Sequence, residues 1–163
     1  MVSRRTIALL AVAAIAVAAV ALPAVAGGKP TLAVENEDDD AYRVTVYAAE
    51  DRQRAMATNF EITTRDGERR LATLGQLYWP DGHRNVTLAD EGVPSESVRV
   101  GPGESSNATF EDWPRGHVTF TMAERRNGSR WIHEWTNVGS CGDTGQEIAV
   151  TLEEGGASWS SSC

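Results

Sequence analysis

The sequence predicts an all-β fold, an antiparallel β-sandwich of about 7 to 10 short strands. From Thr31 onward, short segments alternate between apolar and polar residues, and turn residues separate them at intervals typical of a sandwich. No segment in this region keeps the apolar period of about 3.6 residues that marks an amphipathic helix. Strands with this pattern bury their apolar faces by packing as two layered sheets.

Each expected strand is an alternating segment bounded by turn residues. In chain order the expected strands are Thr31 to Glu35, Tyr42 to Ala49, Asn59 to Thr64, Arg69 to Leu74, Asn85 to Leu88, Ser97 to Val100, Ser106 to Phe110, His117 to Glu124, Arg130 to Thr136 and Glu147 to Leu152. Only Asp51 to Thr58 is a candidate for a helical turn.

Two hairpins can be expected from their turn residues. Asn127-Gly128 tolerates the positive φ angles of a tight two-residue turn. A turn centred there predicts a core face with Val118, Phe120 and Met122 opposite Asn137, Trp135 and His133, and a solvent face with Thr119 and Thr121. The second turn, Arg65-Asp66-Gly67-Glu68, predicts that Ile62 lies opposite Leu71.

The first 26 residues have the features of an export signal. Arg4 and Arg5 precede an uncharged run of 21 residues, which ends in Ala24-Val25-Ala26, a sequence suited to signal peptidase. Ser3-Arg4-Arg5-Thr6-Ile7 resembles the twin-arginine export motif. The sequence therefore predicts a signal peptide over 1–26, one domain over 27–163, and an extracellular or envelope location. The alternative is an uncleaved anchor, because the run is long enough to cross a bilayer, and this segment would then be the protein's membrane contact.

The charge balance is acidic and nearly free of lysine. The chain has 15 Lys and Arg against 23 Asp and Glu, a net charge of −8, and Lys29 is its one lysine. With no basic block, it is a poor candidate for binding nucleic acid. This composition, together with the twin-arginine leader, resembles exported proteins of halophilic archaea. An ordinary acidic secreted protein remains the alternative.

Two segments resemble parts of secreted prokaryotic immunoglobulin-like domains. Val98-Arg99-Val100-Gly101-Pro102-Gly103-Glu104, followed by Ala108-Thr109-Phe110, resembles their strand, Pro-Gly-Glu turn and strand. Thr31 to Asn36, leading through acids into Val44 to Tyr47, resembles their opening hairpin. The resemblance implies an immunoglobulin-like sandwich and no particular activity. The strand order stays open, because both cysteines lie near the C-terminus and cannot form the usual inter-sheet pair.

Cys141 and Cys163 are the two cysteines, and both lie in the exported part. Outside the cytoplasm a disulfide between them is the default, and it would tie down the Gly- and Ser-rich tail. The alternative is that Cys141 acts as a nucleophile.

Large aromatic residues beside turns are the main candidates for ligand binding. Tyr78, Trp79 and Trp113 neighbour Pro-containing turns, where flat rings could stack on sugars or contact a partner protein. The alternative is that these rings plug the ends of the sandwich.

Three Asn-x-Ser/Thr sequons are candidate glycosylation sites, at Asn85, Asn107 and Asn127. Asn107 is the best candidate because it lies next to the Pro-Gly-Glu turn, whereas a tight turn constrains Asn127.

No motif specifies a reaction, a cofactor or a metal. The acidic run from Glu35 to Asp40 lacks calcium-loop spacing. His83, His117 and His133 are not spaced as metal ligands, and Met122 opposite His133 is no copper site without a suitable cysteine. Asp143-Thr144-Gly145 matches the aspartic-protease triplet in an unsuitable context. The favoured function is a non-enzymatic, exported β-sandwich module with a structural or partner-binding role, whose partner is a surface protein or polysaccharide. The alternative is a carbohydrate-binding module.

Overall fold

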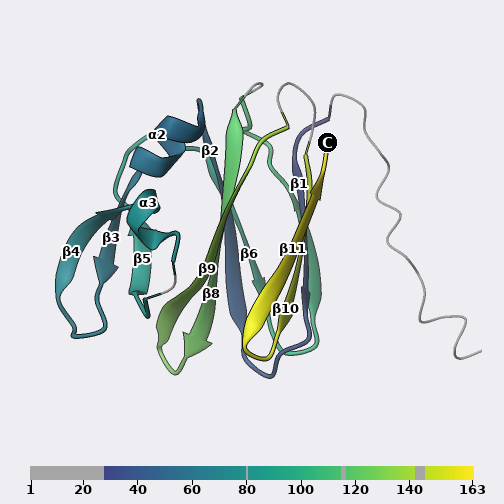
Figure 1. Ribbon diagram of the computed structural model, residues 1–163. Helices are drawn as coiled ribbons and strands as arrows, with labels where there is room; N and C mark the ends of the chain where they lie inside the picture. Colours follow the sequence, from purple (N-terminus) through teal and green to yellow (C-terminus); the bar gives the residue numbers. More distant parts are fainter. Residues whose placement is uncertain (1–27, 80, 115–116, 142–145) are drawn as a thin grey trace, which may run out of the picture.

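The computed structural model is an open sandwich of two β-sheets (Figure 1). It describes residues 28–79, 81–114, 117–141 and 146–163. The expected leader over 1–26 lies outside them. None of the helices within these ranges has the length and hydropathy that crossing a membrane requires. The all-β sandwich predicted from the sequence is confirmed.

The smaller sheet has four strands in the order β11-β10-β1-β7. Their bounds are β1 Thr31–Asn36, β7 Ser105–Thr109, β10 Glu147–Glu153 and β11 Gly156–Ser162. The β1 strand pairs with β10 in parallel, with Val34 beside Val150, and with β7 in antiparallel fashion. The parallel pair is a departure from the expected antiparallel arrangement.

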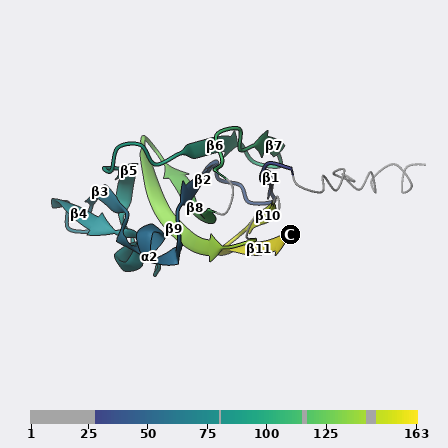
Figure 2. The ribbon, with the colours of Figure 1, turned by 90° about the horizontal axis from the view of Figure 1, so that it is seen from above.

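The larger sheet has seven strands in the order β4-β3-β5-β9-β8-β2-β6, all paired antiparallel. Their bounds are β2 Tyr42–Ala49, β3 Asn59–Thr63, β4 Arg69–Thr73, β5 Arg84–Leu88, β6 Ser95–Val100, β8 Val118–Asn127 and β9 Arg130–Gly139. Two short helices, α2 Arg52–Ala57 and α3 Leu74–Leu77, lie beside the β3–β4–β5 part of this sheet (Figures 1 and 2).

The core between the sheets is built from alternate residues of the central strands. It contains Leu32, Val34, Tyr42, Val44, Val46, Val98, Val100, Ala123, Ile148, Val150 and Leu152. Burying each valine, leucine or isoleucine of this core contributes about 1.5 to 3 kcal/mol before the entropy cost of folding is subtracted.

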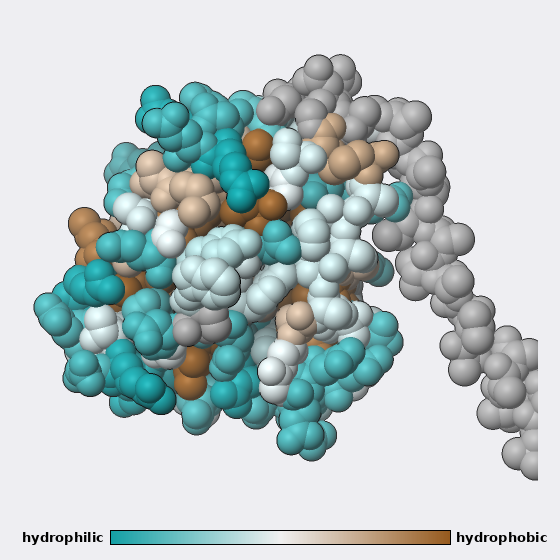
Figure 3. Space-filling view, in the orientation of Figure 1, coloured by the Kyte–Doolittle hydropathy of each residue, from teal (hydrophilic) through white to brown (hydrophobic). Residues whose placement is uncertain are grey.

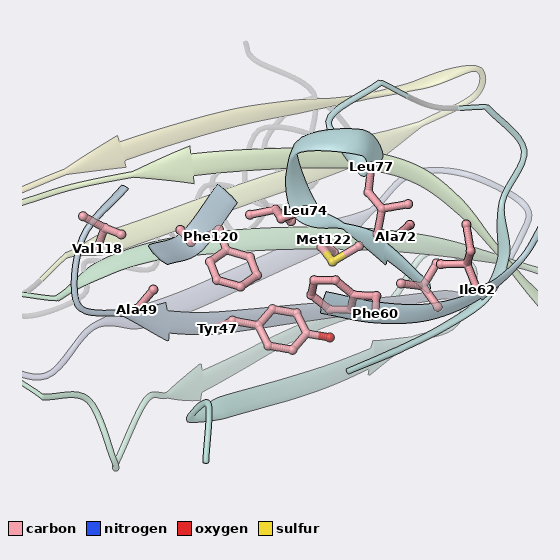
Figure 4. Close-up of a cluster of buried hydrophobic side chains, with 12 residues drawn as sticks. Tyr47, Ala49, Phe60, Ile62, Ala72, Leu74, Leu77, Val118, Phe120 and Met122 are labelled. Carbon is pink, nitrogen blue, oxygen red and sulfur yellow. The ribbon is translucent and has the colours of Figure 1, made fainter. Parts of the chain in front are cut away.

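A second core covers the other face of β2 and β8. Tyr47 and Phe120 stack with ring centroids 4.9 Å apart, and Phe60 meets both rings edge-on (Figure 4). Leu74 and Leu77 of α3 are fully buried in this core. The middle of the seven-stranded sheet is therefore buried on both faces.

The β8–β9 hairpin forms, but its register differs from the one predicted. Asn127 pairs with Arg130, so the two loop residues are Gly128 and Ser129, and Gly128 has the positive φ of +60°. A bulge beside Ala123 shifts the register again, and Met122 lies opposite Thr136 instead of His133.

The predicted solvent face of β8 is also wrong. Thr119 and Thr121 are buried, because this face lies toward the four-stranded sheet. The Thr119 hydroxyl donates to the side-chain oxygen of Gln146, which satisfies a polar group inside the core.

The β3–β4 hairpin forms with a register one residue away from the prediction. Ile62 pairs with Arg70, and Leu71 pairs with Glu61. Because a shift of one residue moves a side chain to the other face of a strand, Leu71 points to solvent.

The acidic run does not form the expected opening hairpin. β1 and β2 belong to different sheets, so residues 37–41 cross from one layer to the other. Asn36 is buried at the crossing, and its side-chain amide donates to the carbonyl oxygens of Asp40 and Gly101, both at 2.8 Å. The crossing loop is thereby tied to the turn between β6 and β7.

The structure joins Cys141 and Cys163 by a disulfide, as the sequence predicted. The tail that was expected to be held only by this bond is itself a strand, β11, which pairs along β10. The disulfide links the residues that follow β9 in the larger sheet and β11 in the smaller sheet. It is therefore a covalent connection between the two sheets.

Candidate functional site

The aromatic pair that follows α3 is the candidate binding site, and we call Tyr78 and Trp79 the aromatic corner. The Gln76 side chain accepts a hydrogen bond from the backbone N–H of Thr73 at 3.0 Å, which stabilises the start of α3. Leu74 and Leu77 anchor this short helix in the core. The residues after Leu77 are therefore held at the surface by a fixed element.

The aromatic corner is unusually exposed for its residue types. Trp79 is 74% exposed and Tyr78 is 36% exposed, and their rings meet edge-on with centroids 5.5 Å apart. Within the described residues, Leu71 of β4 is the one other large hydrophobic side chain that is exposed, at 60%. The face of the molecule in Figure 3 is largely hydrophilic, with separate apolar patches.

Trp113 occupies a different part of the chain from the aromatic corner. It lies between β7 and β8, half-buried, and its indole N–H is buried without a hydrogen-bond partner among the described residues. Of the three predicted ligand-binding aromatics, the structure brings Tyr78 and Trp79 into contact and gives Trp113 the more enclosed position.

A buried polar cluster lies at the end of the second core, and sequence reasoning missed it. Glu124 of β8 is 4% exposed, and the Nε of Arg43 on β2 donates to its carboxylate at 2.7 Å. The Arg43 guanidinium carbon lies 5.1 Å from the centroid of the Trp131 ring, in a cation–π contact. Burial raises the pKa of Glu124, while Arg43 favours its charged form.

Two buried histidines complete this cluster. His133 of β9 is 1% exposed, and His83 is 3% exposed. The backbone N–H of His133 donates to the carbonyl oxygen of His83 at 2.8 Å, and its ring Nε2 lies 2.7 Å from the Thr136 hydroxyl. Burial, reinforced by His83, lowers the pKa of His133 to about 4, and burial also lowers the pKa of His83. Both imidazoles are therefore neutral at pH 7.

The signal that could have located the cluster is the position of Glu124 in the pattern of β8. It continues the alternation of Val118, Phe120 and Met122, so it shares their buried face. A carboxylate at such a position requires a cation nearby. Arg43 supplies it from β2, where it is the direct neighbour of Glu124 across the sheet.

An acid-lined groove opens between β9 and the β10–β11 hairpin. Its volume is about 550 Å³, and the acidic residues that line it are Asp38, Asp39, Asp40, Glu134 and Glu154. Arg125 bridges Asp40 and Glu134 at 2.8 and 2.9 Å. The Tyr42 hydroxyl donates to Asp38 at 2.6 Å, and this hydrogen bond lowers the pKa of Asp38. Several of these carboxylates therefore already have partners within the chain.

The other predicted sites have no catalytic geometry in the described structure. Asp143-Thr144-Gly145 falls outside the described residues. Cys141 is in the disulfide, so it has no thiol to act as a nucleophile. Among the described residues, no three His, Cys, Asp or Glu side chains are grouped to hold a metal ion.

The sequence of this chain matches a known protein family. The family model described as halobacterial Ig domain protein matches residues 1–163. The chain belongs to this family. The immunoglobulin-like resemblance drawn from the strand segments is thereby confirmed, and so is the resemblance to proteins of halophilic archaea drawn from the composition. The family places the chain among domains with a structural or binding role. No curated protein matches the sequence.

Several solved structures align with this chain at low similarity. The type VI secretion lipoprotein TssJ1 from Pseudomonas aeruginosa aligns over 83% of this chain and 97% of its own, with 12% identity and a TM-score of 0.46. The membrane-binding domain of pneumolysin aligns over 83% of this chain and 96% of its own, with 6% identity and a TM-score of 0.34. The human-specific toxin intermedilysin aligns over 82% of this chain and 23% of its own, with 10% identity and a TM-score of 0.35. At these scores no role passes from those proteins to this chain.

Proposed function

We propose that this Ig domain protein is a non-catalytic binding module that works outside the cytoplasmic membrane, and that its aromatic corner contacts a partner protein of the cell envelope. The observation that carries the proposal is the exposure of Trp79. Tryptophan and tyrosine are enriched at the energetic centres of protein interfaces, where they bury large areas with few rotatable bonds.

The position of the corner suits a binding role. Trp79 follows a helix whose two leucines are fully buried, so its backbone is presented by a rigid element. A partner that covers this side chain gains about 2 kcal/mol or more from desolvating it, because a tryptophan carries roughly 150 to 250 Å² of surface. The export features of the N-terminal sequence support an envelope location for that partner.

A test of the corner is to measure binding of the purified, labelled chain to isolated cell envelopes of the native host. The Trp79→Ala substitution is expected to weaken the affinity about 30-fold, which corresponds to about 2 kcal/mol. The matched control is Leu71→Ala, which removes the other exposed hydrophobic side chain and is expected to leave the affinity within about twofold. Equal binding by wild type and Trp79→Ala would exclude the corner as the contact.

Carbohydrate binding is the second candidate, because Tyr78 and Trp79 present flat rings with the exposed Asp81 nearby in sequence. Protease treatment of the envelopes separates the two. A protein partner predicts that protease abolishes binding. A polysaccharide ligand predicts that binding survives protease, and that the polysaccharide quenches tryptophan fluorescence in wild type but not in Trp79→Phe.

A further inference from the structure

The three sequons occupy different structural settings, and the free side chain of Asn107 distinguishes it. Asn107 lies on β7, an edge strand that pairs with β1 on one side. Its residue is exposed, and within the described part of the chain its side-chain amide makes no hydrogen bond. A transferase can therefore reach this amide without breaking an interaction of the fold.

The surface around Asn107 leaves room for an attached group. Asn107 lies on the outer face of the four-stranded sheet, away from the core that the neighbouring Ala108 packs against. The residues in register with Asn107 on the next three strands are Ala33, Ala149 and Ser160. These side chains are short, so none of them overhangs the amide, and Thr109 of the sequon is exposed on the same face.

The other two sequons are engaged by the fold. Asn85 lies on β5 between β3 and β9, has the left-handed φ of 51°, and its side-chain oxygen accepts from the backbone N–H of Trp131 at 3.5 Å. Asn127 closes the two-residue turn of the β8–β9 hairpin, and Ser129 of its sequon is inside that turn.

We propose that Asn107 is the acceptor of an N-linked oligosaccharide, an inference that rests on the exported location in the proposed function. The co-reactant is an oligosaccharide activated on a lipid phosphate. The side-chain nitrogen of Asn107 forms a bond to the anomeric carbon of the first sugar, and the bond from that carbon to the phosphate oxygen breaks. The lipid phosphate leaves with the electron pair, and the amide nitrogen loses one proton to a base of the transferase.

The experiment is peptide mass spectrometry of the full chain purified from the medium or envelope fraction of its native host. The peptide that contains Asn107 is expected to carry hexose-type mass increments. Asn107→Gln and Thr109→Ala are each expected to remove the modification, because both destroy the sequon. Thr109→Ser keeps the sequon and is expected to retain it, which makes it the matched control for any effect of the substitutions on folding.

The possible results separate this inference from the proposed function. A chain that is found outside the cytoplasmic membrane with an unmodified Asn107 peptide overturns the glycan site and leaves the binding module standing. A chain that is found only in the cytoplasm overturns both. Sugar on Asn85 or Asn127 with none on Asn107 contradicts the structural argument for this site.

Discussion

Replacing Arg43 by methionine is expected to lower the free energy of unfolding by about 3 to 5 kcal/mol, because it leaves the buried carboxylate of Glu124 without its counter-charge. The Nε of Arg43 donates to Oε2 of that carboxylate, and Oε1 is buried without a hydrogen-bond partner among the described residues. The measurement is chemical denaturation at pH 7.5 and fixed salt.

Two comparisons make this result specific to the ion pair. The double variant with Arg43→Met and Glu124→Leu is expected to recover most of the lost stability, because an apolar pair needs no counter-charge. The loss in Arg43→Met is also expected to shrink as the pH falls, since burial raises the pKa of Glu124 and the variant lacks the guanidinium that favours its charged form. The role of the ion pair would be contradicted if Arg43→Met lowered the free energy of unfolding by under 1 kcal/mol. It would also be contradicted if the double variant lost as much as Arg43→Met and Glu124→Leu lose separately when added together.

His133 is expected to make the fold sensitive to acid between about pH 6.5 and pH 4. Its pKa falls from 6.5 to about 4 on burial, so the unfolded chain binds a proton in this window that the folded chain does not. The contribution of neutral His133 to the free energy of unfolding is fully present above pH 6.5, and it is lost as the pH falls toward 4. The expected loss is about 3 kcal/mol, because each unit of pKa shift corresponds to about 1.4 kcal/mol.

The groups around His133 determine how this effect must be measured. His83 has a lowered pKa and acts in the same direction, whereas Glu124 has a raised pKa and opposes it. Denaturation of wild type and His133→Gln across this range isolates the histidine, because the other groups are common to both. Glutamine retains a hydrogen-bonding side chain near Thr136. An equally steep pH dependence in both proteins would show that His133 is not responsible.

The strands were predictable from the sequence because alternation and turn residues are local properties. The segments predicted for β2 and β4 agree with the structure to within one residue. The last strand was missed because every residue of Gly156 to Ser162 except Trp159 is small, and its strand conformation depends on the neighbouring β10. The short helix α3 was missed because four residues are too few for a helical period.

The candidate site was only partly predictable. The aromatic residues beside turns could be selected from the sequence, but their exposure could not. Trp79 and Trp113 both precede proline in similar sequence contexts, yet one is exposed and the other is half-buried. The Arg43–Glu124 pair joins residues that are far apart in sequence, and their contact depends on the pairing of β2 with β8.

The sequence by itself determined that this chain forms strands, and it determined the cysteine pairing, because two cysteines permit one intramolecular bond. The tertiary structure alone decided which strands share a sheet and which face of each strand is buried. Strand register depends on the geometry of a turn and on a bulge, and a change of one residue reverses the side-chain directions. For that reason Leu71 is exposed to solvent, and His133 lies opposite Glu124 instead of Met122. Thr121 is buried because the four-stranded sheet covers its face of β8.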